Sequence, residues 1–251
     1  MTSPLLETDL TEPGVLDPAA LQPPITDLPK VAVMCFFQEI ISQAGAEQCA
    51  NLSVYGGCPV YEDDRHGPRI AFFYPGLGAP AAVATMEEMI AFGCHTFIAV
   101  GGAGALVPEL ALGHAMVVDQ ALRDEGTSHH YLPPSRFVEA DHEVSQAIVS
   151  ACERSGLAVG RGNSWTTDAI FRETRSRIDR RVEEGCSMVE MEASAFFAVG
   201  KHRGVRVGQL LYAGDTLAAD DWDGRDWTSA TQTRQALFDI CLAAAATLTQ
   251  D

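Results

Sequence analysis

Three carboxylates near two strand ends are the residues of this chain best placed to do chemistry. Glu190 and Glu192 lie two positions apart, directly before an apolar helical pattern, and Asp215 follows a glycine further along the chain. A side chain at the entry from a strand to a helix projects into a cleft, where a carboxylate binds hydroxyl groups or transfers protons. Glu190 has a second interpretation, as an acidic residue that complements the dipole at the beginning of a helix. Glu192 is flanked by apolar residues, so its carboxylate needs a polar partner, and sugar hydroxyls are suitable.

The composition restricts the kinds of partner. The 251 residues carry a formal net charge of −17, which argues against nucleic acids and anionic membrane surfaces and favours a small-molecule substrate. Seven cysteines without any metal-binding spacing predict a reducing compartment and no metal site. The sequence has no uninterrupted apolar run of about 18 residues. We therefore expect a cytoplasmic protein.

The chain divides into a proline-rich beginning and one α/β domain. Residues 1–29 contain six prolines and no sustained apolar period, which predicts an extended arm. Residues 30–251 alternate apolar strand patterns with helical patterns, which predicts a mixed, largely parallel sheet covered by helices. The expected strands include 31–37, 70–74, 96–100, 115–118 and 205–213, and the expected helices include 141–155, 172–184 and 229–248. The glycine-rich run 101–104 is expected as a turn at a strand end, where ligands collect in such sheets.

Six segments in combination resemble the nucleoside phosphorylase and nucleosidase superfamily, and its uridine- and purine-nucleoside phosphorylase branch in particular. They are residues 76–80, 100–104, 124–131, 166–169, 189–192 and 214–215. The resemblance covers more than half of the chain. It implies a three-layer α/β/α sandwich around a mixed, partly barrel-like sheet. It also implies a homo-oligomer, a dimer or a hexamer, that binds a nucleoside and needs no cofactor, with inorganic phosphate as a possible co-substrate.

The resemblance also implies a role for each site residue. Glu192 corresponds to the carboxylate that binds the ribose hydroxyls, with Glu190 supporting the site, and Asp215 to the acid that protonates or hydrogen-bonds a purine. The positions that contact the sugar or the base are Met191, Ala103, Gly104, Ile170 and Phe171. When an N-glycosidic bond breaks, the sugar becomes cation-like and the base anion-like. Negative groups near the sugar and a donor near the base therefore stabilise the transition state.

The chain departs from the phosphorylase pattern where phosphate binds. Ala99 and Gly102 stand where phosphorylases have an arginine and a serine or threonine, and the N-terminal Gly-Asp-Pro-x-x-Arg motif is missing. Because phosphate without arginine partners is held weakly, hydrolysis is an alternative, with Glu39 as the water-positioning residue. Overall resemblance favours phosphorolysis of a purine nucleoside to free base and ribose 1-phosphate. A third hypothesis is a nucleoside-binding protein that has lost its reaction.

Overall fold

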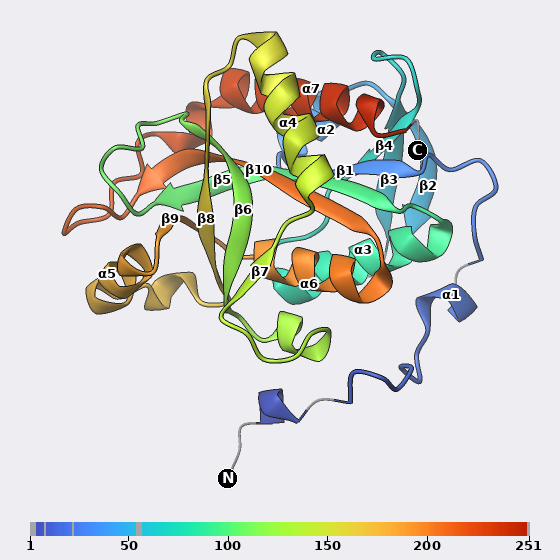
Figure 1. Ribbon diagram of the computed structural model, residues 1–251. Coiled ribbons are helices and arrows are strands. Elements are labelled where there is room, and N and C mark those ends of the chain that lie inside the picture. Colours follow the sequence, from blue (N-terminus) through green and yellow to red (C-terminus); the bar gives the residue numbers. More distant parts are fainter. Residues whose placement is uncertain (1–3, 8, 22, 54–56, 250–251) are drawn as a thin grey trace.

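The chain before the sheet runs along the outside of the molecule. The computed structural model describes residues 4–7, 9–21, 23–53 and 57–249. The predicted arm also includes residues 1–3, 8 and 22, which lie outside the described residues. Its described part has only a 3-10 turn, η1 (Pro4–Leu6), and one short helix, α1 (Pro18–Leu21), and it passes beside the helices in Figure 1.

The described residues form one mixed ten-stranded sheet. Its strands are β1 (Val31–Cys35), β2 (Glu47–Leu52), β3 (Cys58–Asp63), β4 (Ile70–Phe73), β5 (Thr96–Ala105), β6 (Ala115–Asp124), β7 (Phe137–Glu139), β8 (Val159–Thr167), β9 (Cys186–Glu190) and β10 (Arg206–Thr216). Strand β10 pairs with both β5 and β6, and this closes β5, β9, β8, β6 and β10 into a ring. Strands β1, β4, β3 and β2 extend β5 as an open sheet. The predicted mixed, partly barrel-like sheet is therefore confirmed.

Helices cover both faces of the sheet and make the three layers visible in Figure 1. One face carries α2 (Gln38–Gln43), α4 (His142–Ser155) and α7 (Thr231–Thr247), and the other carries α3 (Ala79–Phe92) and α6 (Ala193–Arg203). Helix α5 (Arg175–Glu183) packs near β9. Among the described residues, no helix has the length and apolar character needed to cross a membrane.

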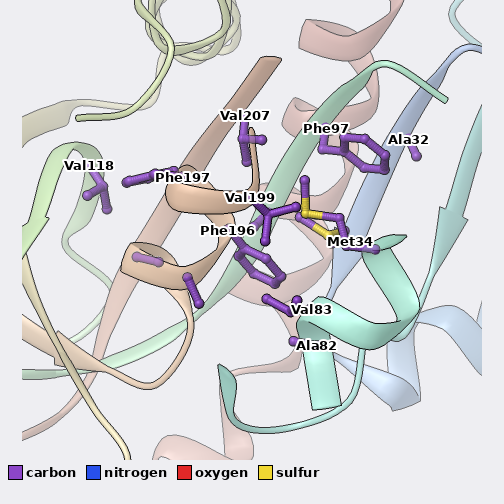
Figure 2. Close-up of a cluster of buried hydrophobic side chains, with 14 of the residues drawn as sticks. Ala32, Met34, Ala82, Val83, Phe97, Val118, Phe196, Phe197, Val199 and Val207 are labelled. Carbon is purple, nitrogen blue, oxygen red and sulfur yellow. The ribbon is translucent and has the colours of Figure 1, made fainter. Parts of the chain in front are cut away.

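Helix α6, which follows the two glutamates, is apolar along most of its length because it is enclosed. Phe196, Phe197 and Val199 are buried in the same cluster as Val83 of α3 and Phe97 of β5 (Figure 2). Burying each large apolar side chain contributes roughly 1.5–3 kcal/mol to folding. This packing fixes the beginning of α6 relative to the sheet, and with it the carboxylates that precede the helix.

The glycine-rich run 101–104 is not the turn that its sequence suggests. It continues β5 as far as Ala105, in register with β10, and Gly104 also pairs with Val189 of β9. The neighbours explain the glycines: a Cβ atom at Gly101 would lie 3.2 Å from the ring of Phe36. The run is therefore a strand segment that other side chains approach closely.

Several other boundaries differ from the expectation. The strand expected at 115–118 continues to Asp124, and the helix expected at 172–184 begins only at Arg175, after the 3-10 turn η4 (Ile170–Arg172). Strands β2, β3, β7 and β8 were not predicted. Their many polar residues do not form the apolar pattern of a buried strand, because each strand contains residues that are exposed or only partly buried.

Candidate active site

A cavity of about 950 Å³ lies beside the glycine-rich part of β5 and the ends of β9 and β10. The nine residues predicted for the site all line it: Asp215, Glu192, Glu190, Met191, Ala103, Gly104, Ile170, Phe171 and Glu39. They come from distant parts of the chain. The ring closure between β5 and β10 brings the glycine-rich segment and Asp215 side by side.

Glu190 is a buried carboxylate whose two oxygens are both occupied by the protein. Oε1 accepts hydrogen bonds from the hydroxyls of Thr166 (2.6 Å) and Ser164 (3.2 Å). Oε2 accepts from the backbone N–H groups of Glu192 (2.7 Å) and Ala193 (2.6 Å) at the beginning of α6. Glu190 therefore binds N–H groups at the beginning of a helix, as its second interpretation predicts. Burial raises the pKa of Glu190, and these four donors offset part of that effect.

Glu192 is almost as buried and lines the cavity. Its Oε1 accepts a 2.5 Å hydrogen bond from the backbone N–H of Gly78, in the loop before α3, and the backbone N–H of Met191 also interacts with its carboxyl group. Burial and the neighbouring charge of Glu190 raise the pKa of Glu192 to about 8. A buried carboxyl group of this kind is stabilised by hydroxyl groups that enter the cavity.

Asp215 lies at the end of β10, directly after an irregularity in the ladder with β5. The indole Nε1–H of Trp222 donates a 2.6 Å hydrogen bond to Asp215 Oδ2. Trp222 lies in the loop that an antiparallel bridge between Thr216 and Asp223 closes, so the chain turns back toward the carboxylate. The segment after Asp215 therefore contributes directly to the site.

Gly104 stands beside Asp215 in the wall of the cavity. A Cβ atom at this position would lie 2.5 Å from Leu217 Cδ1 and 3.0 Å from Val189 Cγ1, so a side chain here would require Leu217 to shift. The glycine therefore lets Leu217 and Val189 pack against the backbone next to Asp215. These apolar side chains and the one carboxylate together suit a flat heterocycle.

The mouth of the cavity carries exposed apolar side chains from η4 and from the segment after β10. Phe171 is 94% exposed and Ile170 is 46% exposed, while Trp222 and Trp227 are 63% and 45% exposed. Met191 lies between the two glutamates and is half-buried. Large apolar groups at the rim of a polar cavity are typical of a surface that a ligand covers.

Arg234 is the only arginine or lysine among the described residues that line the cavity. The residue is 7% exposed. It donates to Glu39 Oε1 (2.5 Å), to the hydroxyl of Tyr212 (3.0 Å) and to the carbonyl oxygen of Trp227 (2.7 Å). The guanidinium also stacks over the rings of Phe37 and Trp227. The buried Arg234 and the partly exposed Glu39 thus form an ion pair in the cavity wall.

The positions that depart from the phosphorylase pattern lie in the same region. Ala99 is buried inside β5, and Gly102 faces the ring of Tyr212, whose Cε1 would lie 3.2 Å from a Cβ at this glycine. Tyr212 thus occupies the space beside Gly102, and its hydroxyl accepts a hydrogen bond from Arg234. The guanidinium of Arg234 therefore lies near Gly102, although residues 100–104 contain no basic side chain.

Among the lining residues that sequence reasoning missed are Arg234, Tyr212 and Glu173. Arg234 is a single basic residue in an otherwise apolar helical pattern, and this was a usable signal, because a charge on a buried helix face needs a partner. Tyr212 and Glu173 gave no such signal. Burial and the charge of Asp215 raise the pKa of Glu173 to about 7.

Proteins similar in sequence to this chain include a guanosine phosphorylase and several uridine phosphorylases. A guanosine phosphorylase from Halorubrum lacusprofundi is 26% identical over 197 residues, which cover 78% of this chain and 77% of that protein. A uridine phosphorylase from Thermococcus kodakarensis is 29% identical over 57% of this chain, and one from Treponema pallidum is 31% identical over 54% of it. The matched stretches span only 56% and 57% of the lengths of those two uridine phosphorylases.

The fold has a solved counterpart. The crystal structure of purine nucleoside phosphorylase from Toxoplasma gondii, in complex with immucillin-H, superimposes with a TM-score of 0.77 at 21% identity, over 89% of this chain and 93% of that one. At this identity the likeness establishes the fold. The family model described as the phosphorylase superfamily matches residues 31–248, which include the whole sheet and the cavity. The chain belongs to the phosphorylase superfamily.

Proposed function

We propose that this protein cleaves the N-glycosidic bond of a nucleoside. The observation that carries the proposal is that one cavity holds the buried Glu190 and Glu192 together with Asp215. Glu192 binds the ribose hydroxyls through its carboxyl group. Glu190 holds Glu192 in place through the backbone N–H of that residue. Asp215 hydrogen-bonds the base.

The chemistry follows from the charges that develop as the bond breaks. The sugar becomes cation-like, and the carboxyl oxygens of Glu190 and Glu192 stabilise that charge. The base becomes anion-like, and a proton or a hydrogen-bond donor at the base lowers the barrier. Neither step requires a cofactor, so the only co-substrate in this proposal is the nucleophile.

We propose inorganic phosphate as that nucleophile, with ribose 1-phosphate as the product. The names of the relatives support phosphorolysis, and so does Arg234, because a guanidinium is the side chain best suited to a phosphate oxyanion. Glu39 then acts as the group that Arg234 binds while phosphate is absent. Arg234 thus binds phosphate in place of the arginine that phosphorylases have at the position of Ala99.

Hydrolysis is the second candidate, and one observation favours it. Glu39 projects its carboxylate into the cavity beside the only basic side chain of the described lining. In this arrangement Arg234 orients Glu39, and Glu39 positions a water molecule and takes its proton. The two candidates make opposite predictions about phosphate.

For the base we propose a purine. Asp215 accepts or donates a hydrogen bond at the ring, and the apolar side chains of Leu217 and Val189 line the cavity beside it. The guanosine phosphorylase relative supports this proposal, while the uridine phosphorylase relatives make uridine the necessary comparison.

Base release from a panel of nucleosides, with and without phosphate, tests the proposed reaction. We expect purine release that requires phosphate, and ribose 1-phosphate as the sugar product. Asp215→Asn and Glu192→Gln each reduce turnover by about 10²-fold or more. The exposed Asp220, in the same segment as Asp215, provides the control variant Asp220→Asn. Wild-type rates in both site variants contradict the mechanism, and nucleoside binding without any base release indicates a binding protein.

The nucleophile is tested at the ion pair. If phosphate attacks, Arg234→Gln raises the KM for phosphate by roughly tenfold to a hundredfold, because it removes a charged hydrogen bond, and leaves the KM for the nucleoside near its wild-type value. If water attacks, base release is independent of phosphate, and Glu39→Gln abolishes it. Phosphate-independent release of free ribose rules out phosphorolysis.

A further inference from the structure

A second carboxyl group lies at the base end of the cavity. Glu173 directly follows the 3-10 turn η4 that carries Ile170 and Phe171, and its half-buried side chain lines the same cavity as Asp215. The family resemblance assigns it no role. Its position beside residues that the proposed function places against the nucleoside makes it a candidate for the chemistry.

The segment that carries Glu173 is tied to the segment that follows Asp215. Arg175, two residues after Glu173, donates hydrogen bonds through Nη2 to the carbonyl oxygens of Leu217 (2.9 Å) and Ala219. These bonds link the beginning of α5 to the chain after β10. Glu173 and Asp215 are therefore held together at one end of the cavity.

The two carboxyl groups have different surroundings. Asp215 accepts the hydrogen bond of the Trp222 indole at 2.6 Å. Glu173 is partly buried and lies within reach of the charge of Asp215. Burial and the charge of Asp215 raise the pKa of Glu173 to about 7. A carboxyl group with this pKa still carries a proton near neutral pH and can donate it to a leaving base.

The other charged groups near this end of the cavity do not lower the pKa of Glu173. Arg175 directs its guanidinium to backbone carbonyl oxygens and lies 4.0 Å from Asp179, so it is engaged elsewhere. Glu190 and Glu192, before α6, are themselves acidic and buried. No basic side chain of the described lining other than Arg234, which is bound to Glu39, faces the cavity.

We propose that Glu173 is the general acid of the reaction, and that Asp215 is the hydrogen-bond partner that holds the base against it. As the bond between C1′ and the base nitrogen breaks, its electron pair passes to the base, and the carboxyl proton of Glu173 moves to the base. The nucleophile forms the new bond to C1′. Glu173 remains as a carboxylate and takes up a proton from water before the next turnover. This inference rests on the proposed cleavage of an N-glycosidic bond.

Two substrates that differ in their need for a proton test the assignment. Guanosine needs an acid for its base to leave, whereas 7-methylguanosine already carries a positive charge on its base and leaves without one. In the full-length protein, Glu173→Gln reduces kcat for guanosine by about 10²–10⁴-fold and leaves kcat for 7-methylguanosine nearly unchanged. Glu173→Asp restores part of the guanosine activity. Glu183→Gln, a neutralised glutamate on the exposed side of α5, behaves like wild type.

The pH profile provides a second readout that a structural role does not produce. For guanosine, wild-type kcat/KM is level in acid and falls as the pH rises through about 7, because the protonated form of Glu173 is the active one. Glu173→Gln lacks this fall. If Glu173→Gln slows both substrates equally, or slows neither, the assignment is wrong although the proposed function stands. If wild type releases base from neither substrate, the proposed function itself fails.

Discussion

Replacing Glu192 by glutamine removes a buried acid that the folded chain must keep protonated, so we expect a variant that is more stable at neutral and alkaline pH and much less active. Glu192 is 4% exposed, and burial together with the charge of Glu190 raises its pKa from 4.5 to about 8. The amide has nearly the same shape, and its oxygen retains the hydrogen bond from the N–H of Gly78. The substitution therefore removes the ionisable group and keeps this hydrogen bond.

The direction of the pH dependence follows from the raised pKa. Below about pH 4.5 Glu192 is protonated in both the folded and the unfolded chain, and its ionisation affects neither. As the pH rises to about 8, the unfolded chain releases the proton and the folded chain retains it, so the folded state loses stability. With about 1.4 kcal/mol for each tenfold difference in proton affinity, the loss at pH 7 is roughly 3 kcal/mol.

Thermal unfolding of wild type and Glu192→Gln, measured side by side from pH 5 to pH 8, tests this expectation. For a domain of this size roughly 3 kcal/mol corresponds to a rise in Tm of about 6–12 °C at pH 7. The difference between the two proteins is small at pH 5 and grows with pH. A control, Glu183→Gln, removes an exposed carboxylate from α5 and changes Tm little at either pH.

The comparison with wild type matters because many other groups titrate over the same range. A Tm difference that stays constant from pH 5 to pH 8 refutes the reasoning, since it means that Glu192 is not held protonated by burial. A variant that is less stable at every pH refutes it as well. A gain in stability together with a loss of turnover indicates that the site keeps an unfavourable carboxylate for its function.

Three further substitutions have defined outcomes. Gly104→Ala places a Cβ 2.5 Å from a methyl group of Leu217 and displaces that side chain beside Asp215, so the KM for the nucleoside rises while the fold, followed by circular dichroism, is retained. Trp222→Phe removes the hydrogen-bond donor to Asp215 and lowers kcat/KM by roughly tenfold. The Tm is unchanged because Trp222 is 63% exposed. Unchanged kinetics would contradict the role of Trp222 in holding Asp215. Thr166→Val leaves Glu190 Oε1 without its shortest hydrogen bond and lowers the free energy of unfolding by about 1–3 kcal/mol in urea titrations.

Local patterns in the chain were sufficient to predict the fold class and the carboxylates of the cavity, and the family resemblance added further lining positions. Alternating apolar strands and helices indicate a layered α/β fold, and carboxylates at strand ends indicate where a ligand collects. The nine predicted positions line one cavity. The glycine-rich run was misread as a turn, because glycine in a sequence does not distinguish a turn from a strand that needs close approach.

The sequence by itself determined the kinds of groups present: acidic residues before an apolar helix, an aspartate after a strand and glycines where side chains are excluded. Only the tertiary structure decided which groups meet. Arg234 reaches Glu39, 195 residues away, because α7 packs against the sheet beside β1 and β5. Glu173 approaches Asp215 because the beginning of α5 is bonded to the chain after β10. Burial and neighbouring charge, which set the protonation of Glu173 and Glu192, exist only once the sheet has closed.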